Sequence, residues 1–95
     1  MKIYIIEKFS SDETMHNIEG VSTDINTIKE RLKEVVKRYE DDGYHLGEIY
    51  ESYFLNVSKN IDENKREVIF IKINECEDGK FVNKPMKNIY EFYNS

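Results

Sequence analysis

Residues 22–39 read Ser-Thr-Asp-Ile-Asn-Thr-Ile-Lys-Glu-Arg-Leu-Lys-Glu-Val-Val-Lys-Arg-Tyr, and they predict the main helix of the protein. Ser22, Thr23 and Asp24 carry oxygens that accept hydrogen bonds from the free N–H groups of a first helical turn. Gly43 is typical of a residue that ends a helix. The apolar residues between these ends recur every three or four positions: Ile25, Ile28, Leu32, Val35, Val36 and Tyr39. This spacing predicts a long amphipathic helix whose apolar face packs on a sheet.

Strands are predicted on both sides of this helix. The stretch 2–9 carries apolar side chains on both faces at its centre, from Ile3 to Ile6, which indicates an inner strand covered at least partly on both sides. A polar turn at 10–13 leads to a second strand near 15–21 and closes a hairpin.

Two further strands are predicted at 53–59 and 67–75, joined by a polar loop at 60–65. In the later strand the isoleucines at odd-numbered positions face the core, whereas Phe70 and Lys72 face away.

The C-terminal part contains a hairpin signal at Asp78-Gly79 and a short returning strand at Phe81-Val82. Beyond Pro85, apolar residues at helical spacing predict a short C-terminal helix: Met86, Ile89, Tyr90 and Tyr93. The sum is an α+β fold of one domain, residues 1–95, in the order ββαββ. An antiparallel sheet of about four strands carries one long helix on one face. The expected core residues are Ile28, Leu32, Val35, Ile69 and Ile71.

The opening Lys2-Ile3-Tyr4-Ile5-Ile6-Glu7, followed by Gly20-Val21-Ser22-Thr23 before the helix, resembles a group of small uncharacterised bacterial and phage proteins. The resemblance covers roughly the first 40 residues. It implies a ββαβ arrangement and brings no activity and no functional residues.

The 95-residue chain has a formal net charge of -5, from 14 Lys and Arg against 19 Asp and Glu. Binding to nucleic acid through phosphate contacts needs a basic surface, and so does attraction to an anionic membrane. We therefore expect no direct nucleic-acid partner and no membrane partner. The charge balance suits a basic protein partner, although it also serves solubility by itself.

Composition also bears on compartment and origin. Cys76 is the one cysteine, so no disulfide forms within the chain. The residues after Met1 alternate like a strand and lack the apolar segment of a signal peptide. We expect a cytoplasmic protein, in the host cytoplasm if a phage encodes it. Ile, Lys and Asn are abundant and Ala and Gln are absent, which is typical of a low-GC bacterium or of a phage or mobile element within one.

The sequence contains no motif typical of a metal or nucleotide cofactor. His16, His45 and Cys76 lie in separate segments without the paired spacing of metal ligands. The glycines are scattered and form no phosphate-binding loop. We expect no metal, no other cofactor and no catalytic residue.

The segment 40–51 carries the pattern that points most clearly to function. It holds five carboxylates, two tyrosines and one histidine, without Lys or Arg. Carboxylates suit a partner rich in Arg and Lys, and tyrosines often anchor interfaces. The candidate partner-binding residues are Glu40, Asp41, Asp42, Tyr44, Glu48, Tyr50 and Glu51.

Other interpretations of these segments stay open. The segment 40–51 also fits a solvated connection after a helix. His45 with Asp42 or Glu48 could act as acid and base in a small hydrolase, although such a site lacks a nearby cation to stabilise developing negative charge. The aromatic segment 89–93 either caps the sheet or contacts a second copy in a homodimer.

Together these features favour a small, acidic, non-enzymatic protein-binding module. Size and charge are also typical of phage inhibitors of host defence, such as anti-CRISPR proteins, and an anti-defence inhibitor is the specific expectation. The alternative is a small-ligand or nucleotide binder or sponge, in which Tyr and Phe stack on bases and Lys or Arg hold phosphate.

Overall fold

Within the described part of the chain, the main architectural finding is a six-stranded antiparallel sheet with two helices, where the sequence predicted about four strands. The computed structural model describes residues 1–11, 15–48, 51–77 and 84–95. In chain order the elements are β1 (Lys2–Ser10), β2 (His16–Ser22), α1 (Ile25–Asp41), β3 (His45–Leu46), β4 (Leu55–Asp62), β5 (Lys65–Glu77), β6 (Lys84–Pro85) and α2 (Ile89–Asn94). The strands lie in the order β2-β1-β5-β4-β3, and β6 pairs with β5. The α+β class and the long helix are confirmed.

The two additional strands, β3 and β6, have two residues each, too few for an alternating pattern. They are strands because long neighbours offer them backbone partners. His45 pairs with Ser58 of β4, and Pro85 pairs with Asn74 near the end of β5. The predicted hairpin at Asp78-Gly79 and strand at Phe81-Val82 lie outside the described residues.

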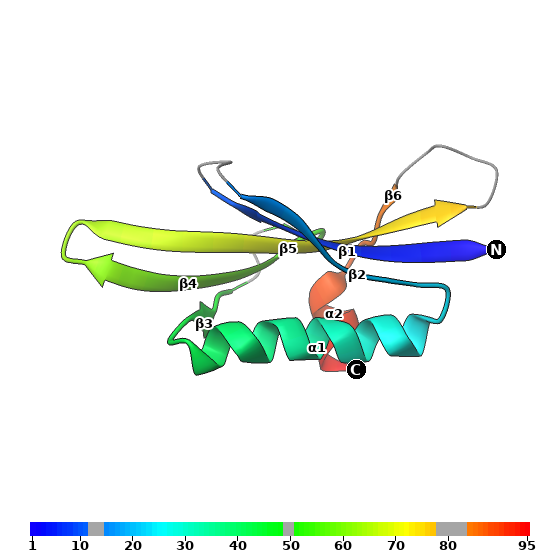
Figure 1. Cartoon of the computed structure of the whole chain (residues 1–95), viewed down its shortest axis with the longest axis horizontal. Helices are drawn as coiled ribbons and strands as arrows, with labels where there is room; N and C mark the ends of the chain where they lie inside the picture. The colour runs from blue at the N-terminus through cyan, green and yellow to red at the C-terminus, as the bar shows by residue number, and fades with distance from the viewer. Residues whose placement is uncertain (12–14, 49–50, 78–83) are drawn as a thin grey trace.

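Strands β4 and β5 form a hairpin longer than predicted. The expected polar loop at 60–65 shrinks to a two-residue turn, because Asp62 pairs directly with Lys65. The Asp62 carboxylate accepts a hydrogen bond from the Asn64 backbone N–H at 2.8 Å, which stabilises this turn. The polar residues around it are strand residues that extend beyond the core, where both faces meet solvent (Figure 1).

Helix α1 begins as its sequence predicts. The Asp24 side chain accepts a hydrogen bond from the Asn26 backbone N–H at 2.9 Å. After the helix, Gly43 has φ +91°, a conformation that glycine adopts without strain. The helix buries its predicted apolar face: Ile28, Leu32, Val35 and Val36. Ile25, which the pattern assigned to the same face, is 40% exposed in the first turn.

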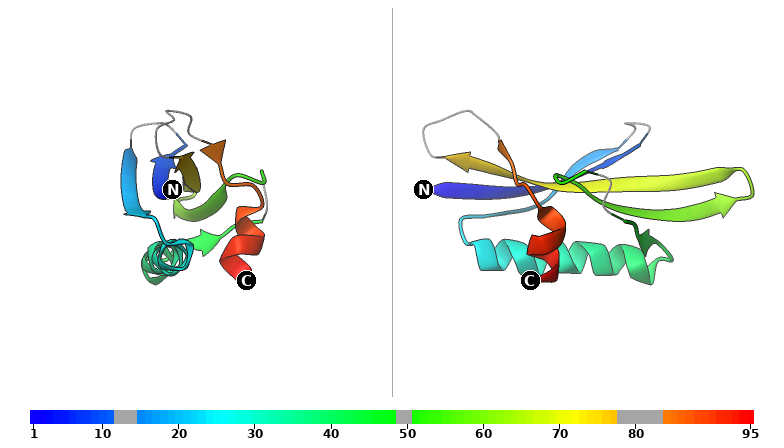
Figure 2. Two further views of the ribbon diagram at one scale, coloured as in Figure 1. Left: turned by 90° about the vertical axis from the view of Figure 1, so that its right-hand side faces the viewer. Right: turned by 180° about the vertical axis from the view of Figure 1, so that it is seen from behind.

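The core lies between the sheet and the two helices. All five predicted core residues are at most 1% exposed. Both helices cover the same side of the sheet (Figures 1 and 2). On α2, Ile89 and Tyr90 are buried, and Phe92 and Tyr93 pack against the core. The aromatic C-terminal segment therefore caps the sheet, which is the first of the two interpretations that the sequence left open.

The opposite side of the sheet is called the outer face here, and seven strand residues define it: Ile5, Glu7, Phe9, Ile18, Val21, Phe70 and Lys72. Strand β1 is an inner strand, as predicted, and its Ile6 points into the core. Alternation turns Glu7 the other way. The register then pairs Glu7 with Lys72 and Phe9 with Phe70 on that outer face.

Candidate functional site

Helix α1 ends in carboxylates. Glu40 and Asp41 form its end, Asp42 is its C-cap, and all three are exposed. The C-terminus of a helix carries partial negative charge, so carboxylates here oppose the helix dipole. A basic residue in this position would stabilise the helix. The acidic end is defined as Glu40, Asp41, Asp42, Glu48 and Glu51, and its first three carboxylates lie exposed at the negative pole of α1.

Tyr44, one of the two predicted anchors, lies in the core and is 7% exposed. Its ring packs edge-to-face on Tyr39, with ring centroids 5.0 Å apart. Burial, with a hydrogen bond from its hydroxyl to the Glu67 carboxylate, raises the pKa of Tyr44 to about 12. This ring therefore anchors the connection after α1 and offers a partner little surface. The second predicted anchor, Tyr50, lies outside the described residues.

Tyr90 of α2 fixes the next part of the connection. Its hydroxyl donates to the Gly47 carbonyl oxygen at 2.9 Å, and it accepts a hydrogen bond from Asn56 Nδ2 at 3.1 Å. The same Nδ2 donates to the Glu48 carbonyl oxygen at 2.9 Å. Burial raises the pKa of the Tyr90 hydroxyl. The Glu48 backbone is thus held from two sides while Glu48 itself is exposed.

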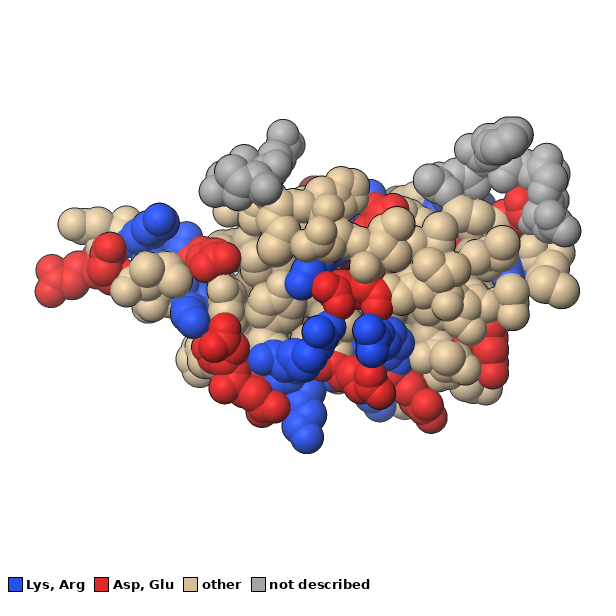
Figure 3. Space-filling model, in the orientation of Figure 1, with Lys and Arg blue, Asp and Glu red and all other residues tan. Residues whose placement is uncertain are grey.

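The fold places lysines from other parts of the chain beside the acidic end, whereas residues 40–51 themselves contain no lysine. Lys59 of β4 lies 3.7 Å from the Asp42 carboxylate and donates to the Asp42 carbonyl oxygen at 3.0 Å. Lys33 and Lys37 share a surface hollow of about 650 Å³ with Glu40 and Asp41. Figure 3 shows charges of both signs interspersed along α1. Glu48 and Glu51 are exposed as well.

The candidate hydrolase residues do not meet in the described part of the chain. His45 is exposed in β3, and its side chain has no hydrogen bond or ion pair with Asp42 or Glu48 there. Among the same residues, no group of three His, Cys, Asp or Glu side chains is arranged to hold a metal ion. No described helix is long and apolar enough to cross a membrane.

An aromatic cluster on the outer face was missed by sequence reasoning. Phe9 stacks on Phe70 with ring centroids 5.5 Å apart, and Phe54 meets the edges of both rings. The His16 ring lies 6.3 Å from the Phe9 ring. Alternation predicted that Phe70 faces away from the core, but only the β1–β5 register shows that Phe9 lies opposite it.

A hollow of about 380 Å³ adjoins this cluster, lined by Phe9, Met15, His16 and Lys72. Beside it, a Glu7 carboxylate oxygen lies 3.6 Å from Lys72 Nζ and 3.3 Å from His16 Nε2. An aromatic surface next to basic groups can stack a flat ring and attract an anionic group. The Glu7 carboxylate offsets part of that attraction.

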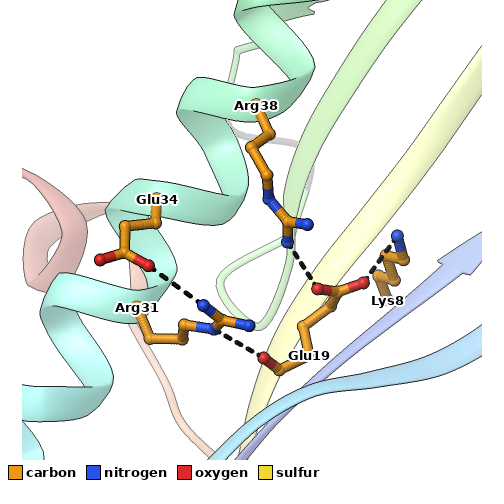
Figure 4. Close-up of polar contacts among 5 residues, drawn as sticks. All are labelled: Lys8, Glu19, Arg31, Glu34 and Arg38. Atoms are coloured by element: carbon orange, nitrogen blue, oxygen red, sulfur yellow. Dashed lines mark hydrogen bonds and ion pairs between the residues drawn. The ribbon is translucent and has the colours of Figure 1, made fainter.

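On the helix side, Glu19 joins β2 to β1 and α1 (Figure 4). Its carboxylate lies 2.7 Å from Lys8 Nζ and 2.6 Å from Arg38 Nη2, and its carbonyl oxygen accepts from Arg31 Nε at 2.9 Å. Burial by itself would raise the pKa of Glu19, but the hydrogen bonds from Lys8 and Arg38 outweigh it and lower that pKa. Because the charged groups of this network pair with one another within the chain, the network indicates a structural role.

Comparison with known proteins finds no matching family model, no matching curated protein and no matching solved structure.

Proposed function

We propose that the protein is a small, non-enzymatic protein-binding module that meets a basic partner with its acidic end. The observation that carries the proposal is the position of Glu40, Asp41 and Asp42 at the C-terminus of α1. Carboxylates at this pole oppose the helix dipole by about 0.3–1 kcal/mol each. A position that costs stability and adds carboxylates to the negative pole of a helix supports the attraction of a basic surface, although Lys33, Lys37 and Lys59 offset part of the charge.

The rigid setting of these carboxylates supports the same proposal. Tyr44 is buried beneath the connection, and Tyr90 holds the carbonyl groups of Gly47 and Glu48. A partner then orders little backbone when it binds, which lowers the entropic cost of association. Buried Tyr44 is not part of the proposed surface.

The specific form of the proposal is an inhibitor of host defence encoded by a phage or mobile element. Small size, the net charge of -5 and a composition rich in Ile, Lys and Asn support it. An inhibitor of this kind binds its target in a defined stoichiometry without turnover.

The test compares two charge reversals of equal size. One variant carries Glu40→Lys, Asp41→Lys and Glu48→Lys, and the control carries Glu30→Lys, Glu63→Lys and Glu91→Lys, all at exposed positions. Wild type and both variants are immobilised to capture partners from lysate. The partner that wild type captures is then purified, and its binding kinetics with all three proteins are measured at low and high salt.

We expect the acidic-end variant to associate more slowly and to lose salt dependence, because exposed charges act mainly by steering. The control variant should associate faster than the acidic-end variant and should keep a stronger salt dependence. Equal effects of the two variants would show that net charge matters and that the acidic end does not.

The alternative function is a small-ligand or nucleotide binder, and the hollow beside Phe9 favours it. Its volume of about 380 Å³ lies within the ~300–1,000 Å³ range of ligand pockets. A nucleoside monophosphate that binds there should raise the melting temperature of wild type more than that of Phe9→Ala/Lys72→Ala. No shift with any of the four ribonucleoside monophosphates would reject this alternative.

A further inference from the structure

The short helix α2 lies beside α1 on the helix side of the sheet and contacts the connection that follows α1 (Figure 2). Its first residue, Ile89, donates its backbone N–H to the Ser52 carbonyl oxygen at 3.1 Å. The hydroxyl of the next residue, Tyr90, lies 2.9 Å from the Gly47 carbonyl oxygen and 3.2 Å from the Glu48 carbonyl oxygen. Two consecutive residues of α2 therefore hold this connection at separate points.

The same helix borders the end of α1. Tyr93 and Asn94 of α2 line a surface hollow together with Glu40 and Asp41, the last two residues of α1. Helix α2 thus adjoins both parts of the acidic end: the carboxylates at the end of α1 and Glu48 on the connection. A displacement of α2 would remove neighbours from both parts at once.

Asn56 of β4 joins the connection and α2 to the sheet. Its Nδ2 donates to the Tyr90 hydroxyl at 3.1 Å and to the Glu48 carbonyl oxygen at 2.9 Å. Its carbonyl oxygen accepts from the Gly47 backbone N–H at 2.8 Å. Hydrogen bonds that share donors and acceptors in this way polarise and strengthen one another. The docked position of α2 and the ordered connection therefore stabilise each other.

Two features indicate that α2 opens more easily than the sheet. It has six residues, Ile89–Asn94, which are too few for a helix that is stable alone. Asn88, the residue before it, has φ 57° and ψ 44°, a left-handed conformation that costs a residue with a side chain more than it costs glycine. Segments with few buried residues open at a lower free energy than the core. We therefore expect α2 to undock while the sheet stays folded.

We propose that α2 is a conformational strap for the acidic end: docked α2 holds the connection that carries Glu48 in place, and undocked α2 releases it. Coupling between two sites is reciprocal, so a molecule that fixes the connection also stabilises docked α2. A molecule that displaces α2 loosens the connection. The effect on partner binding rests on the proposed function, whereas the coupling itself is a property of the free chain.

The test measures hydrogen exchange of single backbone amides in the full chain by NMR. The Phe92 amide, which donates to the Asn88 carbonyl oxygen at 3.2 Å, monitors α2, and the Gly47 amide monitors the connection. The amides of β1 and β5 monitor the sheet. Asn88→Val opposes the left-handed backbone before α2, because β-branched residues adopt it least readily. The matched control, Asn17→Val, makes the same change at an exposed position of β2.

We expect Asn88→Val to speed exchange at both Phe92 and Gly47 by about tenfold and to leave the amides of β1 and β5 unchanged. Asn17→Val should speed exchange at neither amide. A second variant, Tyr90→Phe, keeps the buried ring and removes the hydroxyl. It should also speed exchange at both amides, by about two- to tenfold, because docked α2 loses its hydrogen bond to the connection.

The two amides decide the proposal together. Either variant that speeds exchange at Phe92 or Gly47 and not at the other amide overturns it, because α2 and the connection would then open separately. Unchanged exchange at both amides in both variants also overturns it. Equal acceleration of every amide, β1 and β5 included, overturns it as well, since α2 would then open only when the whole chain unfolds. None of these measurements needs a partner, so their failure is distinct from a failure of the proposed function.

Discussion

Gly47 is the residue at which the connection after α1 comes closest to β4. A Cβ at this position would lie 2.0 Å from Asn56 Oδ1 and 2.9 Å from Asn56 Cγ. Asn56 has little freedom to withdraw, because its Nδ2 donates to the Glu48 carbonyl oxygen and to the Tyr90 hydroxyl. The absence of a side chain at Gly47 thus permits the hydrogen bonds that hold the acidic end in place.

We predict that Gly47→Ala lowers the free energy of unfolding by about 1–3 kcal/mol, because Asn56 must give up its hydrogen bonds. The matched control is Gly20→Ala. There the close atom is Cγ of Arg31, at 2.9 Å, in a long and exposed side chain that can move. Urea unfolding checks both variants, and an equal loss in each would contradict the role assigned to Asn56.

Tyr44 predicts a loss of stability at alkaline pH. Its folded-state pKa is raised to about 12, whereas a tyrosine in an unfolded chain titrates near ~10. The stabilisation is therefore complete below pH ~10 and is lost as pH rises toward ~12, because the unfolded state releases its proton first.

Burial also raises the pKa of Tyr90 and Tyr93, so these residues contribute in the same direction. The comparison that isolates Tyr44 is wild type against Tyr44→Phe, by urea unfolding at pH 9 and pH 11. Wild type should lose more stability than the variant between these values. Parallel losses would mean that the Tyr44 hydroxyl titrates as in the unfolded chain.

At the scale of elements, α1 is held to the sheet mainly by its apolar face. Leu32 is fully buried at the centre of that face. Leu32→Ala should lower the free energy of unfolding by about 2–5 kcal/mol, through lost burial and the cavity left behind. Ile25→Ala, at a position 40% exposed on the same helix, should cost much less. Thermal unfolding distinguishes them, and an unchanged melting temperature for Leu32→Ala would refute the packing described.

The Glu19 network is the polar link between β2 and α1, and it predicts a loss of stability in acid. The pKa of Glu19 is lowered from 4.5 in the folded state, so its contribution is present above pH ~4.5 and is lost as pH falls below that value. Glu19→Gln should be less stable than wild type at pH 7 by about 1–3 kcal/mol, because Lys8 and Arg38 lose a charged acceptor. It should also respond less to acid. Glu30→Gln, at an exposed helix position, is the control, and equal acid responses in Glu19→Gln and wild type would contradict this prediction.

At the scale of the whole molecule, the net charge of -5 predicts how salt should act on binding. Salt screens the attraction between the acidic end and a basic partner, so we expect the association rate to fall as salt rises. Binding kinetics from low to high salt measure this effect. An association rate that does not change with salt would contradict steering by exposed charge.

Local patterns were sufficient for elements whose formation depends on neighbours in the chain. Helix α1 was predictable because its cap, its apolar spacing and its terminal glycine all act within one or two turns. The outward direction of Phe70 and Lys72 was predictable because alternation is a property of a single strand. The acidic end was recognisable for the same reason, since Glu40, Asp41 and Asp42 are consecutive.

Contacts between distant segments were decided by the tertiary structure. Strand β3 exists because β4 has a second edge that β5 does not occupy, and β6 exists because β5 extends past the end of β4. A two-residue strand has no pattern of its own. Pairing register brought Phe9 to Phe70, and a single bulged residue, Glu19, set Ile18 and Val21 on the outer face. Packing buried Tyr44 and placed Lys59 beside Asp42. The physical reason is common to all of them: register and side-chain packing depend on the energy of the whole assembly of elements, which no short stretch of sequence contains.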